Sequence, residues 1–530
     1  MTPGAATPAA MPPAPARAAE SRDPATGQVW RRYPSADANA VRAALETARA
    51  AQRAWGALPS RRRARVVEQF RRVLFARRAD VTDVIQRENG KPAAEALATE
   101  VMTTLDMARY VARHAPRLLA DEHHTPFNIA MWRKRITLRH EPFGVVGVVS
   151  PWNYPFMLAA GIVLPAVAAG NGVLLKPSEY TPGSGVLLGE LLAEAGVPAG
   201  LVHVLTGDGS TGAAVVDAGV DKVFFVGSAA AGRKVATACA ARLIPCVLEL
   251  GGSDPAIVLV DADLDTAASG IAWGRFSNAG QTCTAPKRIL VEDAVFEAFV
   301  NRLAARVRAL RVGPGASPET DVGPVIRPSQ KAALQRQLDD ALARGASIAA
   351  QGSATTGGDF FPPTLLVNVA GGMGVLREET FGPLLPVLRV RDADEAVRIA
   401  NASPFGLSAS IWSRDLARAR RIAARLEVGS VVINDVAVAA GIAEVPHGGV
   451  KESGWGNSHG AMGLLECVRT KAVITDWFAG WRQAWWFGYG PAHARDLDGF
   501  LSFWHGRALG DRLRGAWQAV RLLLRPERPL

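Results

Sequence analysis

The strongest constraint on the fold is an alternation of short apolar runs with helix-length segments between Phe143 and Val260. Strands separated by helices pair in parallel through crossover connections, so this region predicts a layered α/β sheet. The runs are GVVGVV (144–149), VLL (173–175), VHVL (202–205), KVFFV (222–226), CVLEL (246–250) and AIVLV (256–260).

A second alternation follows and predicts a second α/β unit. A chain of 530 residues is longer than one hydrophobic core usually serves, which agrees with two units. No apolar run is long enough to span a bilayer. The expected strands of this second unit are 289–293, 384–390, 408–413 and 430–434, and its expected helices are 296–310, 394–401 and 415–426.

Charge and cysteine content exclude several classes of protein. The chain has 60 basic and 49 acidic residues, but Arg is scattered and not interleaved with aromatic residues, which argues against a nucleic-acid binder. The 4 cysteines form no CxxC pair and show no metal-ligand spacing, so we expect no disulfide framework and no metal site. These features favour a reducing compartment and a cytoplasmic protein.

The first segment, residues 1–22, is expected to be a disordered tail. It is rich in Ala and Pro and lacks the basic start and continuous apolar stretch of a secretory signal. From Asp23 the composition becomes globular. Val41, Leu45, Ala48, Ala51 and Trp55 then recur at helical spacing and predict an amphipathic helix.

Cys283 is the candidate nucleophile. It lies in a loop of small and polar residues, Asn278-Ala-Gly-Gln-Thr-Cys-Thr-Ala285, just beyond an apolar helix. A free Cys is often only a small core residue, and a free thiol with a pKa of about 8.5 is mostly unreactive at neutral pH. A catalytic role therefore needs nearby donors and a base.

Glu249 is the candidate base. It interrupts the apolar run CVLEL directly before Gly251 and Gly252, where burial without a partner would be costly. The alternative is a Glu at the end of an edge strand that points to water. Asn153, in Pro151-Trp-Asn-Tyr-Pro155, follows another predicted strand, and its amide could serve either as an oxyanion donor or only as a turn residue.

Two segments are candidate nucleotide sites. A strand ends at Gly227-Ser228 and a helix begins there, so free backbone N–H groups could hold a pyrophosphate. Lys176 and Glu179 follow another strand, where they could bind the hydroxyls of a ribose. Taken singly, Gly227-Ser228 is better explained by an ordinary strand–helix turn, and a solvated loop explains Lys176 and Glu179 equally well.

Taken together and in this order, the motifs resemble the aldehyde dehydrogenase superfamily. They are PWNYP, KPSE, FVGS, LELGG, GQTCTA, EETFGP and PHGGVKESGWG, and the resemblance runs from about Asp23 to Asp476. It implies that the Cys283 thiolate attacks an aldehyde, that Asn153 stabilises the oxyanion, and that Glu249 activates the water that hydrolyses the thioester. A carboxylic acid is the implied product.

The resemblance also implies a set of cofactor-binding residues. A carboxylate at the ribose 2′-hydroxyl repels a 2′-phosphate, so Glu179 favours NAD, with NADP as the alternative. Trp152 is expected on the adenine side and Phe381 near the nicotinamide ring. The implied residues are Trp152, Lys176, Glu179, Gly209, Gly227, Ser228, Leu250, Glu379 and Phe381.

By the same resemblance we expect an aldehyde dehydrogenase-like α/β fold, with a Rossmann-like cofactor domain, an α/β catalytic domain and a β-arm for oligomerisation. A homodimer or homotetramer follows. The expected boundaries are 23–122 and 141–251 for the NAD-binding domain, 252–450 for the catalytic domain, 123–140 and 451–476 for the arm, and 477–530 for a C-terminal extension.

The substrate is less constrained. Family members that act on succinic semialdehyde resemble one another in an Arg eight residues after the motif Asn, and here that position is Gly161. An apolar aliphatic or aromatic aldehyde is favoured over a semialdehyde. The alternatives are a non-catalytic membrane-associated scaffold and transfer of the acyl group to coenzyme A. Either an apolar pocket or plain helix core would explain Tyr154, Met157, Leu158, Val436, Val438 and Ala439.

The extension departs from the family pattern. Six of the 13 Trp residues fall in 477–530. Leu509, Leu513, Ala516, Val520 and Leu524 share one helical face, with Arg elsewhere on the helix. This pattern predicts either an amphipathic segment on the inner surface of a membrane or a helix that packs on protein.

Overall fold

The computed structural model describes residues 18–353, 357–478, 483, 485–487 and 489–524, and it separates into two compact units. One comprises the chain up to Leu119 together with Glu141–Arg469, and the other comprises Ala120–His140 together with the chain from Thr470. Residues 1–17, which belong to the expected N-terminal tail, lie outside the described residues.

The first sheet of the larger unit has six strands in the order β19-β9-β8-β5-β6-β7. Five are parallel, and they bury both faces, which explains their continuous apolar sequences. The parallel strands are β5 (Val145–Val149), β6 (Gly172–Lys176), β7 (Val202–Val204), β8 (Lys222–Val226) and β9 (Cys246–Glu249), and β19 (Gly454–Trp455) is antiparallel to β9.

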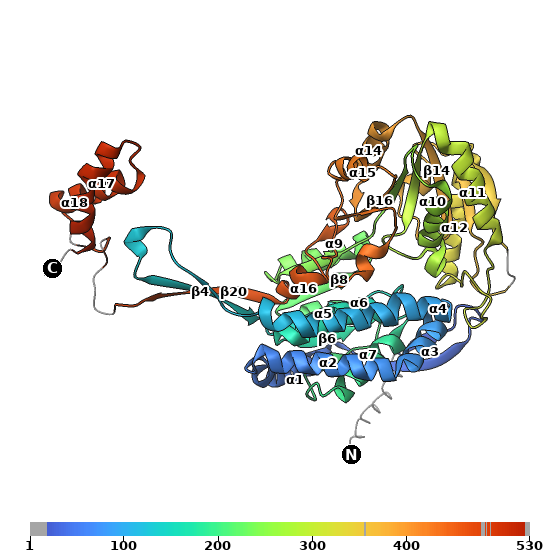
Figure 1. Ribbon diagram of the computed structural model, residues 1–530. Coiled ribbons are helices and arrows are strands. Elements are labelled where there is room, and N and C mark those ends of the chain that lie inside the picture. Colours follow the sequence, from blue (N-terminus) through green and yellow to red (C-terminus); the bar gives the residue numbers. More distant parts are fainter. Residues whose placement is uncertain (1–17, 354–356, 479–482, 484, 488, 525–530) are drawn as a thin grey trace, which may run out of the picture. The chain divides into compact units, whose positions relative to one another are not determined.

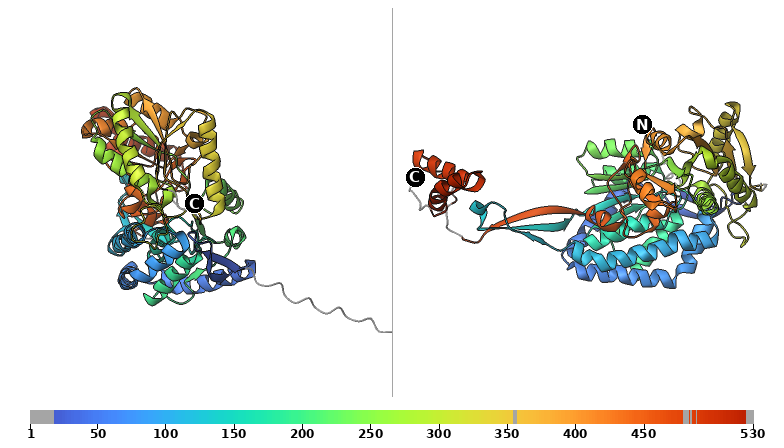
Figure 2. Two further views of the ribbon diagram at one scale, coloured as in Figure 1. Left: turned by 90° about the vertical axis from the view of Figure 1, so that its right-hand side faces the viewer. Right: turned by 45° about the horizontal axis from the view of Figure 1, so that its top comes forward.

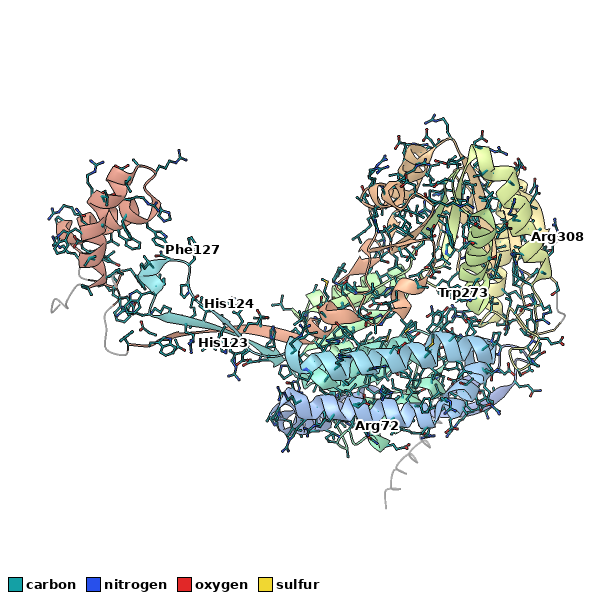
Figure 3. The ribbon with its side chains drawn as sticks, viewed as in Figure 1. Arg72, His123, His124, Phe127, Trp273 and Arg308 are labelled. Carbon is teal, nitrogen blue, oxygen red and sulfur yellow. The ribbon has the colours of Figure 1, made fainter. Side chains whose placement is uncertain are left out.

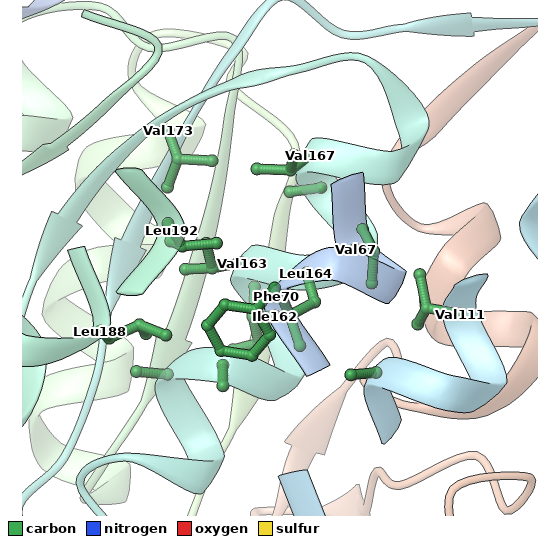
Figure 4. Packing of buried hydrophobic residues seen from close by; sticks show 14 of the residues in the cluster. Val67, Phe70, Val111, Ile162, Val163, Leu164, Val167, Val173, Leu188 and Leu192 are labelled. Atoms are coloured by element: carbon green, nitrogen blue, oxygen red, sulfur yellow. The ribbon is translucent and has the colours of Figure 1, made fainter. Parts of the chain in front are cut away.

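Helices cover both faces of this sheet (Figure 1). Alternate strand residues enter the two cores, because successive side chains of a strand point to opposite faces. On one face, Phe70 is fully buried among Ile162, Val163 and Leu188 (Figure 4). That face carries α2 (Ser60–Ala76), α3 (Arg78–Asn89), α5 (Thr103–Leu118), α6 (Met157–Ala169) and α7 (Pro182–Glu194), and the other carries α1 (Ala38–Gly56), α8 (Gly209–Asp217) and α9 (Ala229–Ala240).

The second sheet has seven strands in the order β12-β13-β14-β11-β10-β16-β17, all parallel to their neighbours except β12. Its strands are β10 (Asp254–Val258), β11 (Pro286–Glu292), β12 (Ser347–Gln351), β13 (Thr364–Val367), β14 (Leu384–Val390), β16 (Ser408–Trp412) and β17 (Ser430–Ile433). One face packs on α10 (Leu264–Phe276), α11 (Phe296–Ala309) and α12 (Pro328–Ala343), and the other on α14 (Ala393–Asn401) and α15 (Leu416–Ala423). The predicted α/β class, with a Rossmann-like and a catalytic sheet, is confirmed.

The smaller unit contains a three-stranded sheet, β20-β4-β3, and a pair of helices. The strands are β3 (Glu122–His124), β4 (Lys134–Pro142) and β20 (Val468–Asp476), and the helices α17 (Pro491–His505) and α18 (Leu509–Leu523) pack side by side (Figures 1 and 2). Phe500, Ala519 and Leu522 form its small core. Phe127 lies in the connection between β3 and β4 (Figure 3). Its ring contacts Trp504 edge to face, with 5.8 Å between ring centroids.

Two expected boundaries are wrong. Residues 18–22 belong to no disordered tail, because they form β1 (Ala18–Arg22), which pairs with β2 (Val29–Pro34). Residues 451–467 are not part of the arm, because β19 adds to the first sheet and α16 (Gly460–Leu465) packs against α5 and α6. Gly454 allows this pairing, since its φ is +106° and a Cβ atom there would lie 2.0 Å from the Leu248 carbonyl oxygen.

Candidate active site

The candidate site forms where parallel strands of the first sheet end. Asn153 follows β5, Lys176 ends β6, Gly227 and Ser228 follow β8, and Glu249 ends β9. Neighbouring parallel strands present their carboxyl ends at one edge of a sheet, where α/β proteins bind ligands. The sequence-predicted residues of four separate motifs therefore meet at this edge.

Cys283 is brought to the site by a strained turn after α10. Asn278 and Ala279 have positive φ values of +52° and +53°, and Gly280 has +73°. A Cβ atom on Gly280 would lie 2.5 Å from the backbone of Gly382, so only glycine fits there. Cys283 is partly exposed, whereas Thr282 and Thr284 beside it are buried.

Asn153 is held against the Cys283 loop. Its side-chain amide donates to the Gln281 carbonyl oxygen at 3.1 Å, and its own carbonyl oxygen accepts from the Asn278 amide at 2.8 Å. The neighbouring Tyr154 hydroxyl lies 2.8 Å from the Thr282 hydroxyl. Asn153 therefore lies at the loop that carries the thiol, as an oxyanion donor requires.

A buried ion pair supports this arrangement. Lys91 and Glu100 have fully buried side chains and approach within 2.7 Å. Lys91 also donates to the Asn153 carbonyl oxygen at 3.0 Å, and Glu100 accepts from the backbone N–H groups of Phe156 and Met157. Neither residue was singled out from the sequence, because a Lys and a Glu nine positions apart look like solvated surface residues.

Glu249 is buried, so the alternative of a solvent-facing Glu is wrong. Burial raises the pKa of the Glu249 carboxyl group, while the charge of His447 and the neighbouring Ser458 lower it. The His447 Nε2 atom lies 3.6 Å from Glu249 Oε2. His447 lies in the motif PHGG, which by itself does not reveal that this His approaches Glu249.

The Cys283 thiol is protonated at neutral pH. Burial raises its pKa to about 12, Lys287 lowers it, and the carboxylates of Asp254, Glu379 and Glu249 raise it further. The Lys287 ammonium group donates to the Cys283 carbonyl oxygen at 2.6 Å. An attack by Cys283 therefore needs a base that accepts the thiol proton.

The residues expected at the adenosine and phosphate end also come together. Lys176 and Glu179 form an ion pair at 3.1 Å. Ser228 is the N-cap of α9, and Gly209 begins α8 with no protein atom within 4 Å of the position of a Cβ. Leu250 is buried against Gly232 of α9. A cavity of about 800 Å³ beside Glu179 is also lined by Tyr180, Asp208, Arg327 and residues of β1.

Glu379 and Phe381 approach from the second sheet. Glu379 Oε1 accepts from the Gly252 N–H at 3.1 Å and lies 3.8 Å from Lys287 Nζ. The Trp152 ring contacts Phe381 edge to face, with centroids 5.4 Å apart. Trp152 therefore lies beside Phe381, the residue that the resemblance places near the nicotinamide ring.

Among the residues expected to line an apolar pocket, several serve as core. Tyr154, Met157 and Leu158 form a small buried cluster with Met107 and Ala443. Val436 packs into the core of the second sheet, against Gly274. Gly161 lies against His459, where a Cβ atom would be 2.6 Å from Nε2.

The fold and the site together define an NAD(P)-dependent oxidoreductase that acts on aldehydes. Residues 12–473 match the aldehyde dehydrogenase family, and the chain belongs to that family. This agrees with the resemblance seen in the motifs.

Curated relatives and solved structures support the assignment. The chain is 38% identical to a 4,4'-diapolycopene aldehyde oxidase of Methylomonas sp over 94% of each chain. It is 39% identical to a putative succinate-semialdehyde dehydrogenase [NADP(+)] of Mycolicibacterium smegmatis, over 85% of this chain and 87% of that protein. The NAD+ complex of an aldehyde dehydrogenase from Bacillus cereus superposes with a TM-score of 0.83 at 31% identity, covering 87% of this chain and 94% of that chain.

Proposed function

We propose that this enzyme oxidises an apolar aldehyde to its carboxylic acid with NAD, using Cys283 as nucleophile, Asn153 as oxyanion donor and Glu249 as base. The observation that carries the proposal is the meeting of Glu249 and Asn153 with the Cys283 loop at one sheet edge. In the first step the Cys283 thiol loses its proton to solvent water, its sulfur bonds to the aldehyde carbon, and the carbonyl oxygen becomes an oxyanion. The Asn153 amide and the Cys283 backbone N–H then stabilise the oxyanion.

The residues present fit a dinucleotide. The N-terminus of α9 at Ser228 and the open space at Gly209 suit phosphates, and the Lys176–Glu179 pair offers a donor and an acceptor for ribose hydroxyls. We assign Glu379, Phe381 and Trp152 to the nicotinamide end. When bound, NAD would supply the acceptor for a hydride, and loss of that hydride converts the Cys283 adduct into a thioester. Glu249 then takes a proton from the water that hydrolyses this thioester.

The preference for an apolar substrate rests on Gly161 and on the extension. An Arg at position 161 would meet His459, so the site cannot carry a carboxylate anchor there without rearrangement. The match to the diapolycopene aldehyde oxidase covers 94% of this chain, while residues 477–530 are about 10% of it, so the match reaches into the extension. That relative is named for a hydrocarbon aldehyde.

A series of straight-chain aldehydes tests the substrate proposal. We expect kcat/KM to rise about fourfold for each added methylene until the pocket is filled, because burial of a CH₂ group contributes about 0.8 kcal/mol. NADH absorbance measures the rates, with succinic semialdehyde as comparator. A higher kcat/KM for succinic semialdehyde than for every apolar aldehyde would contradict the proposal.

Glu179 should set the preference for NAD. We expect Glu179→Ala to narrow the NAD-to-NADP ratio of kcat/KM by about tenfold, because removal of the carboxylate relieves its repulsion of the 2′-phosphate. Glu194→Ala, on an exposed Glu of α7, is the matched control and should leave the ratio unchanged. Equal use of both cofactors by the parent enzyme would refute this role.

We also propose a homodimer or homotetramer that forms through the arm. β20 is an edge strand and is exposed along nearly its whole length, with Val473 and Ile474 among the exposed apolar residues. Edge strands with free backbone groups pair readily with a second chain. Multi-angle light scattering measures the mass of the assembly directly.

For the extension we propose contact with an anionic lipid surface. No described helix is long and apolar enough to cross a membrane. Described helix α18 instead exposes an apolar stripe of Leu509, Leu513, Trp517, Val520 and Leu524, where Trp517 replaces the expected Ala516. Arg512, Arg514 and Arg521 are exposed beside it. Such helices lie in the headgroup region, with cationic side chains toward anionic lipid. Trp481, which also contributed to this expectation, lies outside the described residues.

The double variant Leu513→Asp, Trp517→Asp should lose co-sedimentation with anionic vesicles by about tenfold or more, because two charges would enter the headgroup boundary. Leu243→Asp, on a Leu of the larger unit that is even more exposed, is the control and should bind as the parent does. If the full-length protein does not co-sediment with anionic vesicles at low salt, the apolar stripe of α18 instead packs on protein.

A further inference from the structure

Two histidines border Glu249, and the catalytic steps described above use neither. The side chains of Glu249 and His447 are both buried and lie 3.6 Å apart, from Oε2 to Nε2. The His459 ring stacks on His447, with centroids 5.7 Å apart and planes inclined by 23°. The candidate base therefore lies at the end of a buried row of two imidazole rings.

His447 is fixed by its backbone. Its N–H donates to the Ser458 carbonyl oxygen at 2.9 Å, and the Ser458 N–H donates to the His447 carbonyl oxygen at 2.8 Å. This bridge ties the loop that carries His447 to the segment before α16. The backbone of His447 is thereby anchored, and its ring nitrogen lies near Glu249 at the end of β9.

His459 stays neutral and closes the far side of His447. Burial lowers the pKa of His459 to about 3, and the neighbouring His447 lowers it further. Within the described part of the chain, neither ring nitrogen of His459 has a hydrogen-bond partner. Gly161 leaves the space that the ring occupies. His447 is therefore the ring of this row that lies within ion-pair distance of the Glu249 carboxylate.

The two carboxylate oxygens of Glu249 have different surroundings. Oε2 faces His447, whereas Oε1 is buried and has no hydrogen-bond partner among the residues that the structure describes. A buried acceptor without a partner is costly and is normally satisfied by water or a ligand. Oε1 is thus the oxygen available to a hydrolytic water.

We propose that His447 is the positioning residue for the base: it holds Glu249 through Oε2 in the ionised form and leaves Oε1 free to deprotonate the hydrolytic water. The inference rests on the proposed role of Glu249. During hydrolysis the water oxygen bonds to the thioester carbon, and one water proton moves to Oε1. The C–S bond then breaks, its electron pair goes to the Cys283 sulfur, and the proton passes from Oε1 to that sulfur. Glu249 is ionised again and His447 is unchanged.

The charges around Glu249 predict how the deacylation rate depends on pH when His447 is replaced. The titratable groups that face Glu249 are His447, with His459 behind it, and Cys283 from the loop after α10. The charge of His447 lowers the pKa of Glu249, which burial raises. Without His447 the carboxylate is protonated at higher pH, so the acid limb of the deacylation rate moves to higher pH.

Two variants of the full-length enzyme separate the effect of charge from the effect of a polar side chain at position 447. His447→Leu removes both, and we expect deacylation to slow about 100-fold at neutral pH while the NADH burst keeps its full amplitude. His447→Gln keeps a donor but no charge. We expect it to deacylate within about threefold of the parent enzyme at pH 9, with an acid limb about one unit higher. His203→Gln, on a half-buried His of β7, is the matched control and should keep the parent profile.

The outcomes are distinct. If the acid limb of His447→Gln is unshifted, the inference is overturned. It is also overturned if both variants lose burst amplitude in proportion to their steady-state rate, because that result indicates a collapsed site. Glu249→Gln tests the underlying function separately. If Glu249→Gln turns over normally, the proposed base is wrong; if it stalls while both His447 variants behave as the parent, only the role of His447 fails.

Discussion

Cys283→Ala is expected to lower the rate of aldehyde oxidation by at least about 10⁴-fold, since no other described group near the aldehyde site replaces the sulfur as nucleophile. The other described cysteines, Cys239, Cys246 and Cys467, lie elsewhere in the first sheet and its helices. NAD binding should persist, because Lys176, Ser228 and Glu179 do not depend on the thiol. Steady-state NADH formation measures the loss, and fluorescence quenching on NAD addition measures binding.

Cys467→Ala is the matched control for this variant. Cys467 is buried next to α16, and burial raises the pKa of its thiol to about 12, as for Cys283. The variant should keep nearly full activity, because its thiol faces the core and not the candidate site. Substantial turnover by purified Cys283→Ala would remove Cys283 from the role of nucleophile.

Glu249→Gln is expected to form one equivalent of NADH per site and then turn over about 10²- to 10⁴-fold more slowly than the parent, because an amide cannot accept the proton of the attacking water. Stopped-flow absorbance resolves the burst from the slow phase. Since burial raises the pKa of Glu249, the parent rate should fall as the pH is lowered through that raised pKa, and the Gln variant should lack this limb.

Glu379→Gln gives a matched comparison for Glu249. Glu379 is also a carboxylate close to the thiol, and burial raises its pKa as well. Its proposed role is at the nicotinamide ribose, so Gln there should change the KM for NAD without leaving a stalled thioester. An unchanged steady-state rate for Glu249→Gln at neutral pH would mean that another group activates the water.

Much of the fold was predictable from the sequence because strands buried on both faces have continuous apolar runs. KVFFV became β8 and LLPVLRV became β14, with boundaries within a residue of those expected. β19 could not be predicted, since Gly454 and Trp455 are only two residues and their pairing depends on a φ that glycine permits. Propensity and periodicity carry little information over so short a segment.

The candidate site was predictable only in part. Motif residues at strand ends converge because the strands are parallel, and this follows from the pattern. The buried Lys91–Glu100 pair does not, because the sequence does not reveal that a charged residue will be enclosed. The proximity of His447 to Glu249 was equally hidden, since it depends on β19 lying next to β9.

The high pKa of the Cys283 thiol has a consequence for the lifetime of the enzyme. Because burial and the neighbouring carboxylates raise this pKa to about 12, the thiol is mostly protonated at neutral pH. Peroxides and alkylating agents react with the thiolate, so the resting site is shielded from them. Between turnovers the Cys283 sulfur is therefore a protonated, weakly reactive thiol. The enzyme should tolerate oxidants that inactivate enzymes whose catalytic cysteine has a low pKa.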